Sequence, residues 1–269
     1  MERYQLYRKA WRFEGAPHEE PRLSKEEARA LLKRDGLLVR NTYDFDLSEE
    51  TSFWYVIKDQ PDGLETLKPR DRNKIRHAFR FFEYRRIPYE LFVQHVFPIL
   101  DDTFKHYKVH DRTMNREVFT KYLEDCQKRH FDYWGIFLKE TQEMVGFCTV
   151  NNWGDCCEYG YSGIDSNYKS HGYYPYYGLY HRLNQYYLEE EGFHYVSDSA
   201  RSITHHSDIQ DFLIQHFNFR KAYCHLEVYY CWWMKVAVKL LYPFRGVITN
   251  SRVKAILNME SMRTQKKQV

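Results

Sequence analysis

The amino-acid sequence predicts an α/β protein, more specifically an α+β fold in which helices flank a mixed, mostly antiparallel central sheet. Short segments rich in β-branched and aromatic residues alternate with segments whose apolar residues recur at helical spacing. Three strand-like segments, at 132–139, 143–151 and 157–164, follow one another with only turns between them. That succession is typical of an antiparallel meander. The length of 269 residues suits one large domain or two small ones.

The composition excludes several classes of protein. With 24 Tyr, 18 Phe and 6 Trp, the chain carries too much apolar bulk for an intrinsically disordered protein. It contains no apolar run of about 18 residues that could cross a bilayer. The first fifteen residues lack the apolar core of a secretory signal, so we expect a cytoplasmic protein whose six cysteines are reduced. No cysteine pair has the spacing of metal ligands, and we expect no metal centre.

The elements can be placed in order along the chain. Ser24 and Glu27 form a capping box at the start of a helix that Gly36 ends. Apolar residues at helical spacing predict a helix over 64–82, and Lys and Arg residues step by four along another of its faces. Further helices are expected near 89–106, 115–130, 175–191 and 208–217. Further strands are expected within 36–47 and 51–59, and at 84–88, 194–199 and 221–230.

Positive charge gathers in two stretches. Residues 68–86 hold eight Lys or Arg against two Asp or Glu, which makes +6 in a helix and the strand after it. Residues 235–269 hold eight Lys or Arg against one Glu, so this tail carries +7 while the rest of the chain carries −4. The near-neutral total of +3 argues against a dedicated nucleic-acid-binding protein.

An amphipathic segment at 231–244, CWWMKVAVKLLYPF, leads into this tail and predicts a helix broken at Pro243. One interpretation is a helix that packs on the body of the protein through its apolar stripe. The other is peripheral attachment to an anionic membrane, because Lys beside Trp and Leu suits such a surface.

Residues 158–174, EYGYSGIDSNYKSHGYY, place a strand directly before a Lys-x-x-Gly turn that opens a helix. Successive backbone N–H groups in such a turn form a cradle for an anion, and glycine lets a phosphate approach the main chain. This segment resembles the acyl-CoA-binding tract of the GNAT acyltransferase superfamily, with Ile164, Tyr168, Lys169 and Gly172 at the matching places. The order of elements over residues 84–230 is also similar to that family.

The resemblance implies acetyl-CoA or another acyl-CoA as co-substrate. The main chain of 169–174 would bind its pyrophosphate, and the strand at 163–165 would line the pantetheine arm. The implied cofactor-binding residues are Gly163, Ile164, Lys169, Ser170, His171, Gly172, Tyr173 and Tyr174.

The sequence also departs from the family pattern. Tyr174 stands where a second small residue is usual, Ser166 replaces a proline, and Asn218 replaces the glycine of a Gly-Phe pair. Family members that protonate the leaving thiolate with a tyrosine carry it on the helix before that pair, and Ile214 occupies the place here.

The N-terminal third is similar to the Fem-type aminoacyl transferases, which are built from GNAT-like units. The matching residues are Trp54, Arg70, Arg72, Ile75 and Arg76, on a strand and on the basic helix. We therefore expect residues 1–83 to be an N-terminal extension or a truncated Fem-like unit. Residues 84–231 would be the GNAT-like domain, and residues 232–269 the basic tail.

Acyl transfer to an amine needs a base, donors at the thioester oxygen and a proton for the thiolate. Glu158, on the strand before the cradle, is the first candidate base, and Asp165 is a second carboxylate that could instead cap a turn. Asp198 ends the next strand, and a loop beyond it carries the candidates Arg201, Ser202, His205 and His206. The catalytic candidates are Glu158, Asp165 and His205; the candidate substrate-binding residues are Trp54, Arg72, Arg76, Arg201 and Ser202.

Together these features predict an N-acyltransferase that moves an acyl group from a CoA thioester to a small-molecule amine, without a metal. One alternative is a Fem-like transferase that uses charged tRNA, with the basic helix gripping phosphates. Another is a binding protein that has lost catalysis.

Overall fold

The computed structural model describes residues 3–61, 63–105, 115–169, 172–203 and 208–264. Its contacts divide the chain into two compact units. The first unit contains Met1–Val56, Ser199–Asp211 and Arg220–Val269, and the second contains Ile57–Asp198 and Phe212–Phe219. The domain boundaries expected from the sequence, at 83/84 and 231/232, stay a prediction. In the structure the basic helix lies in the same unit as the strands that follow it.

The sheet of the second unit is an antiparallel meander with one parallel strand added. Its strands are β5 (Phe82–Ile87), β6 (Phe131–Leu138), β7 (Met144–Asn152), β8 (Cys156–Ile164) and β9 (Tyr195–Ala200). Neighbours from β5 to β8 pair antiparallel, and β9 pairs parallel with β8.

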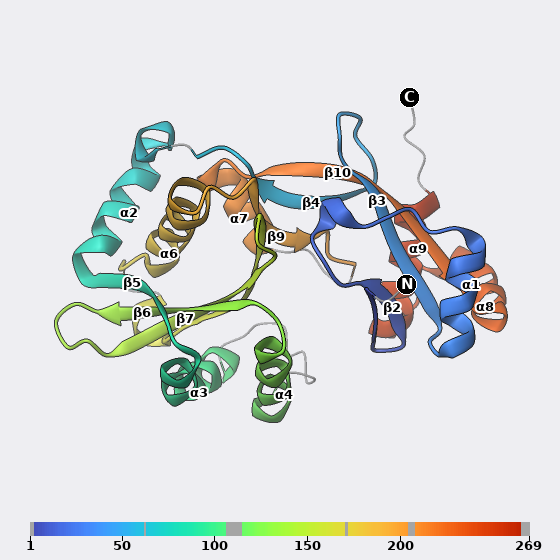
Figure 1. Ribbon diagram of the computed structural model, residues 1–269, viewed down its shortest axis with the longest axis horizontal. Helices are drawn as coiled ribbons and strands as arrows, with labels where there is room; N and C mark the ends of the chain where they lie inside the picture. The colour runs from blue at the N-terminus through green and yellow to red at the C-terminus, as the bar shows by residue number, and fades with distance from the viewer. Residues whose placement is uncertain (1–2, 62, 106–114, 170–171, 204–207, 265–269) are drawn as a thin grey trace. The chain divides into compact units, whose positions relative to one another are not determined.

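Helices cover both faces of this sheet. The helices α3 (Tyr89–Lys105) and α4 (Arg116–Gln127) lie on one face, while α2 (Pro69–Phe81) and α6 (Pro175–Asn184) lie on the other (Figure 1). Successive residues of β6 show the alternation: the Tyr133 ring lies 4.8 Å from that of Phe92 on α3. The Trp134 Nε1 donates to the Tyr187 hydroxyl, in the π-helical turn Gln185–Glu190 that continues α6, at 3.0 Å. Helices therefore bury both faces of the sheet in apolar contacts, and these contacts stabilise the arrangement of its strands.

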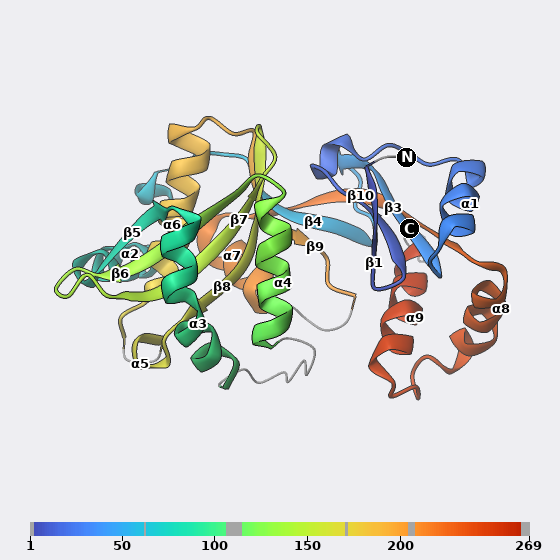
Figure 2. The ribbon, with the colours of Figure 1, turned by 60° about the horizontal axis from the view of Figure 1, so that its bottom comes forward.

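The first unit has its own strands and helices. A hairpin of β1 (Tyr4–Tyr7) and β2 (Ala10–Phe13) leads to β3 (Leu38–Leu47), which pairs antiparallel with β10 (Arg220–Tyr230). Successive residues of β10 reach helices on opposite faces, because the Tyr229 hydroxyl donates to the Leu23 carbonyl and the Tyr230 hydroxyl to Glu260. Glu260 belongs to α9 (Ser251–Thr264), and Leu23 packs with α1 (Lys25–Arg34). Figure 2 shows α1 and α9 on opposite sides of these strands.

The remaining elements are short or follow the strands. They are β4 (Phe53–Lys58), α5 (Ser166–Lys169), α7 (Asp208–Phe217), α8 (Trp232–Leu241) and the 3-10 turns Pro17–Glu19, Leu64–Thr66 and Tyr242–Phe244.

The structure confirms the predicted fold class, with mixed, mostly antiparallel strands flanked by helices. The capping box at Ser24 is present, since its hydroxyl accepts from the Glu27 N–H. The helix predicted over 64–82 begins at Pro69, because a separate 3-10 turn precedes it. The amphipathic helix predicted before Pro243 is present as α8, which ends at Leu241, and the tail contains a further helix, α9, that was not predicted. Within the described residues, no helix is both long and apolar enough to cross a membrane.

Candidate active site

The strands β8 and β9 separate part of the way along their length. They pair from Cys156 with Tyr195 to Glu158 with Ser197, and among the described residues that pairing goes no further. Both strands continue beyond that point. The other edge of β8 stays paired with β7 as far as Ile164. The second half of β8 therefore presents an edge that β9 does not cover.

A β-bulge coincides with this separation. In the register with β7, Cys148 faces Ser162 and Val150 faces Tyr159, so Gly160 and Tyr161 together oppose one residue of β7. A bulge bends a strand and changes the direction of its side chains, and bulges are common beside active sites. Gly160 is required here by close packing, because a Cβ at that position would lie 2.5 Å from the Thr149 Oγ1 and 3.0 Å from the Tyr122 hydroxyl.

Two carboxylates lie where the strands separate. Glu158 is half-buried and is the last residue of β8 that pairs with β9, and Asp198 follows the last residue of β9 that pairs with β8. Burial, and secondly the charge of Glu158, raise the pKa of Asp198 well above its ordinary value. Asp198 therefore keeps its proton to higher pH than an exposed aspartate, beside a second carboxylate that can accept one.

A buried tyrosine joins this group. Tyr180 of α6 is 2% exposed and shares a side-chain hydrogen bond with Ser162, just after the bulge. Burial, followed by the charge of Asp198, raises the pKa of the Tyr180 phenol. Tyr180 was not identified as a site residue from the sequence. The one sequence feature that could have indicated it is its position four residues after Tyr176 on the predicted helix.

The loop after β8 is anchored by two aspartates. Asp102 of α3 accepts from the Ser166 backbone N–H at 2.7 Å and from its hydroxyl at 3.2 Å. Asp165 accepts from the Asn167 backbone N–H at 2.9 Å, which is the turn-capping role that the sequence left open. A catalytic role for Asp165 stays a prediction, and its described contact is structural.

The cradle predicted at 169–174 is partly described. Lys169 is exposed at the end of α5, and Ser170 and His171 lie outside the described residues. Gly172 has a φ of +78°, which favours glycine. Tyr174 adopts a φ of +56° at the N-cap of α6 and leaves its ring 39% exposed. Tyr173 packs against Phe81, with ring centroids 5.0 Å apart.

Cationic and imidazole side chains of α2 adjoin the start of α6. The Lys74 Nζ donates to the Tyr177 hydroxyl at 2.8 Å and lies 5.4 Å from the centroid of the Tyr174 ring. The His77 ring centroid lies 6.0 Å from that of Tyr174. Burial, followed by the charge of Arg70, lowers the pKa of Lys74. A partly desolvated ammonium beside a helix N-terminus favours an anion there.

The other implied cofactor residues face the protein interior. A Cβ at Gly163 would lie 2.6 Å from Phe147 and 2.8 Å from the Thr103 hydroxyl, and Ile164 is 1% exposed. These two residues could therefore meet a ligand only through their main chain.

The predicted substrate-binding residues fall into two groups. Arg72 and Arg76 lie on α2 in the second unit, where Arg76 is exposed and Arg72 donates to the Glu65 carbonyl at 3.4 Å. Trp54 and Arg201 meet in the first unit, with the Arg201 guanidinium carbon 4.2 Å from the centre of the Trp54 ring. The Lys221 ammonium lies at the same distance from that ring.

The loop candidates are described only in part. Ser202 is half-buried in the first unit, whereas His205 and His206 lie outside the described residues. Beyond the loop, α7 ends at Phe217, and Asn218 takes a φ of +56°. Asparagine tolerates this conformation, which explains how it can replace the glycine of the family pattern.

Comparisons with known proteins identify solved structures of similar fold. No model of a known protein family matches the chain, and its sequence matches no protein of curated function. Among solved structures, FemX is similar with a TM-score of 0.54 and 10% identity, over 88% of this chain and 85% of that chain. L-PGS from Bacillus licheniformis is similar with a TM-score of 0.50 and 12% identity, over 97% of this chain and 85% of that one.

A tandem GNAT protein from the clavulanic acid biosynthesis pathway aligns with a TM-score of 0.42 and 13% identity, over 82% of this chain and 74% of that chain. The likeness to FemX and L-PGS shows a GNAT-like, Fem-type fold, as the sequence resemblance predicted.

Proposed function

We propose that this protein transfers an acyl group from an acyl-CoA thioester to an amine acceptor. The observation that carries the proposal is the separation of β8 from β9 at Glu158, which leaves the rest of β8, up to Ile164, uncovered by β9 before the chain turns toward the N-terminus of α6. An uncovered strand edge can hydrogen-bond an extended amide chain such as pantetheine. The loop and Lys74 beyond it suit a phosphate group.

The chemistry follows from the groups beside that edge. The carboxylate of Glu158 takes a proton from the substrate ammonium, and the amine nitrogen then attacks the thioester carbonyl. The new C–N bond forms as the C–S bond breaks. Asp198, which holds its proton to raised pH, gives that proton to the leaving thiolate, and its carboxylate then takes up the second proton of the amine nitrogen. Asp198 thereby fills the role of the family's tyrosine, whose place Ile214 occupies here.

The substrate side is assigned to the basic face of α2. Arg72 and Arg76 would hold an anionic part of the acceptor. Substrate-binding roles for Trp54, Arg201 and Ser202, which lie in the first unit, stay predictions from the sequence. The family resemblance supports the cofactor assignment at Gly163, Ile164 and residues 169–174. No step in this scheme requires a metal.

The test is release of CoA from acetyl-CoA and longer acyl-CoAs in the presence of a panel of primary amines. Glu158→Gln should lower kcat/KM by about 10²–10⁴-fold, because it removes the base. Binding of CoA should persist in this variant. The matched control is Glu143→Gln, an exposed carboxylate in the turn before β7, which should keep its turnover. Equal turnover by Glu158→Gln and the control would rule Glu158 out as the base.

A second candidate is transfer of an aminoacyl group from charged tRNA. The likeness to FemX and L-PGS supports this alternative at the level of the fold. The basic residues of α2 would grip tRNA phosphates. Salt-sensitive retention of tRNA in a filter-binding assay, with tRNA-dependent turnover and no CoA turnover, would favour it. Binding of CoA without any turnover would instead favour a protein that has lost catalysis.

A further inference from the structure

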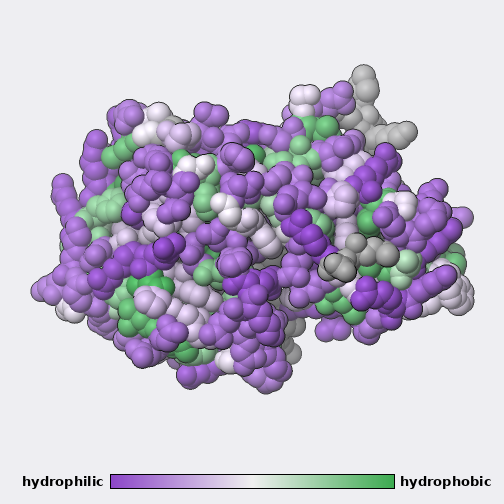
Figure 3. Space-filling view, in the orientation of Figure 1, coloured by the Kyte–Doolittle hydropathy of each residue, from purple (hydrophilic) through white to green (hydrophobic). Residues whose placement is uncertain are grey.

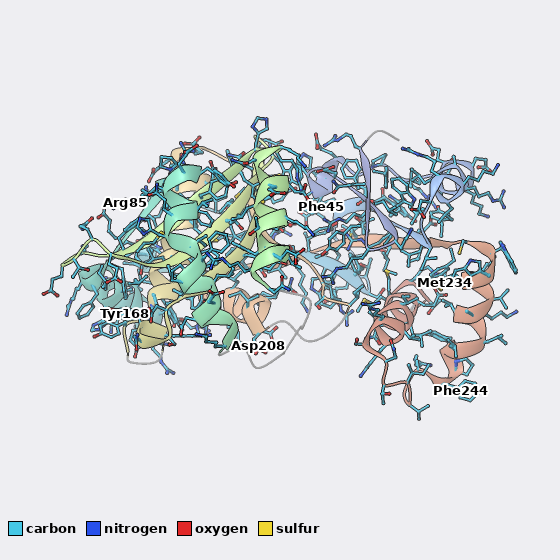
Figure 4. All side chains as sticks on the ribbon, turned by 90° about the horizontal axis from the view of Figure 1, so that it is seen from below. Phe45, Arg85, Tyr168, Asp208, Met234 and Phe244 are labelled. Atoms are coloured by element: carbon cyan, nitrogen blue, oxygen red, sulfur yellow. The ribbon has the colours of Figure 1, made fainter. Side chains whose placement is uncertain are left out.

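The C-terminal helix α8 packs through one of its sides only. Val238 is buried, and Met234 and Ala237 are half-buried, on the side that contacts α9 and β10. This confirms that the tail helix packs on the protein, as one of the two interpretations of the sequence expected. Figure 4 marks Met234 on this helix and Phe244 in the turn that follows it.

The opposite side of α8 leaves large apolar side chains in solvent. Trp232 is 80% exposed and Leu240 is 66% exposed, and Val236 lies between them one helical turn from each. Trp233 is exposed next to this row in sequence, and Phe244 and Val247 are exposed in the segment that follows α8. We call these six residues the α8 apolar face. On the side of the molecule seen in Figure 3, hydrophobic residues form small patches among hydrophilic ones.

Basic residues border this face. At about 100° per residue, Lys235 and Lys239 project within roughly 60° of Trp232, along one side of the Trp232–Leu240 row. Both lysines are exposed, and so is Arg245 in the turn. The sequence has no Asp or Glu from 232 to 250. The charged side chains that residues 232–250 place beside the α8 apolar face are therefore all basic.

This arrangement fits a lipid surface better than a protein partner. Lysine is depleted at the centres of protein interfaces, whereas a helix lying on a membrane combines buried Trp and Leu with Lys beside them. The flexible lysine stems can lie along the acyl chains while their ammonium groups reach the headgroups. Exposed tryptophan is also favoured at the boundary between headgroups and hydrocarbon.

We propose that the α8 apolar face docks on the surface of a bilayer that contains anionic phospholipids. Trp232, Val236 and Leu240 enter the boundary between headgroups and acyl chains, and Lys235, Lys239 and Arg245 pair with lipid phosphates. Docking does not depend on the transferase chemistry proposed above, and its test uses no turnover.

The test is co-sedimentation of the full chain with vesicles of phosphatidylcholine alone or with 30% phosphatidylglycerol, an amount chosen for the assay. The expected result is strong binding to the anionic vesicles at low salt and weaker binding as salt rises. The variant Lys235→Gln/Lys239→Gln should weaken that binding by roughly 25-fold, because each basic residue near such a surface is worth about fivefold. The matched control, Lys121→Gln/Lys128→Gln, removes two exposed charges from α4 and its C-cap and should bind as the wild type does.

A second variant tests the apolar part. Trp232→Ser/Leu240→Ser removes two largely exposed side chains, so the melting temperature should hold while binding to anionic vesicles falls. Failure of the wild type to sediment with anionic vesicles would overturn the proposal. If a concentration-dependent dimer accompanied that failure and Trp232→Ser/Leu240→Ser abolished it, the face would belong to an interface between copies.

Discussion

The position of α6 can be tested at Gly178, where helix propensity and packing predict opposite outcomes. Gly178 lies inside α6, and replacing an interior helical glycine by alanine usually stabilises a helix by about 0.8–1.0 kcal/mol. In this structure a Cβ there would lie 2.2 Å from the Tyr84 hydroxyl and 2.4 Å from its ring carbon Cζ. Tyr84 has little freedom to move, because it is 5% exposed and donates to the Pro175 carbonyl at 3.1 Å.

Overpacking of this kind costs about 1–3 kcal/mol. Subtracting the gain in propensity leaves Gly178→Ala destabilised by roughly 0–2 kcal/mol. A loss of 1 kcal/mol lowers the melting temperature by about 2–4 °C for a chain near this size. Because Tyr84 also anchors the first turn of α6 through Pro175, the variant should bind CoA more weakly as well.

Urea unfolding of a double-mutant cycle measures the effect. In a Tyr84→Leu background, which removes the obstructing ring atoms, Gly178→Ala should cost less than in the wild type, with a coupling of about 0.5–3 kcal/mol. The control is Gly246→Ala, where an added Cβ would meet no atom within 4 Å; its effect should stay within about 0.5 kcal/mol. If Gly178→Ala in the otherwise wild-type protein raised the free energy of unfolding by the full gain in helix propensity, the close contact of α6 with β5 would be refuted.

Three further predictions concern the candidate site. Burial and the charge of Glu158 raise the pKa of Asp198, so the stability that its protonated form supplies is complete below the unfolded pKa near 4 and is lost as pH rises through the raised value. In urea titrations, Asp198→Asn should therefore gain stability relative to the wild type as pH rises from acid to neutral. A stability difference between the two proteins that does not depend on pH would contradict this. Arg72→Ala/Arg76→Ala should raise KM for an anionic acceptor several-fold and leave kcat unchanged, and an unaltered KM in steady-state assays would remove these residues from the acceptor site. Tyr174→Gly relieves left-handed backbone strain of about 1–2 kcal/mol and removes the side chain at the N-terminus of α6. Calorimetry should therefore show tighter CoA binding. Weaker binding would mean that the Tyr174 ring itself contacts the ligand.

Local signals were enough to predict most elements of the fold. The capping box at Ser24 and the apolar spacing of α3 and α4 specify helices within short windows of sequence. The β1–β2 hairpin carries no such signal, because its two-residue turn places Arg8 and Lys9 at φ values of 49° and 67°. Such turns usually contain Asn or Gly, so the turn cannot be recognised from Arg and Lys in the sequence.

Only those residues of the candidate site that lie close together in the sequence could be predicted. Glu158 and the glycine of the cradle lie in one continuous segment, which a motif can reveal. The grouping of Asp198 with Tyr180 and Ser162 depends on a bulge at Gly160 and on the packing of α6 against β8. Those are tertiary contacts between residues far apart in sequence, and no short window contains them.

Thermal unfolding with CoA, acetyl-CoA, longer acyl-CoAs and charged tRNA tests the central claim most directly. An acyl-CoA at one hundred times its dissociation constant should stabilise the protein by about 2.7 kcal/mol and raise its melting temperature by several degrees. Lys74→Ala should reduce that rise, because it removes the cation beside the start of α6. If no CoA species shifts the melting temperature and charged tRNA does, the acyl-CoA assignment of the 169–174 loop is contradicted.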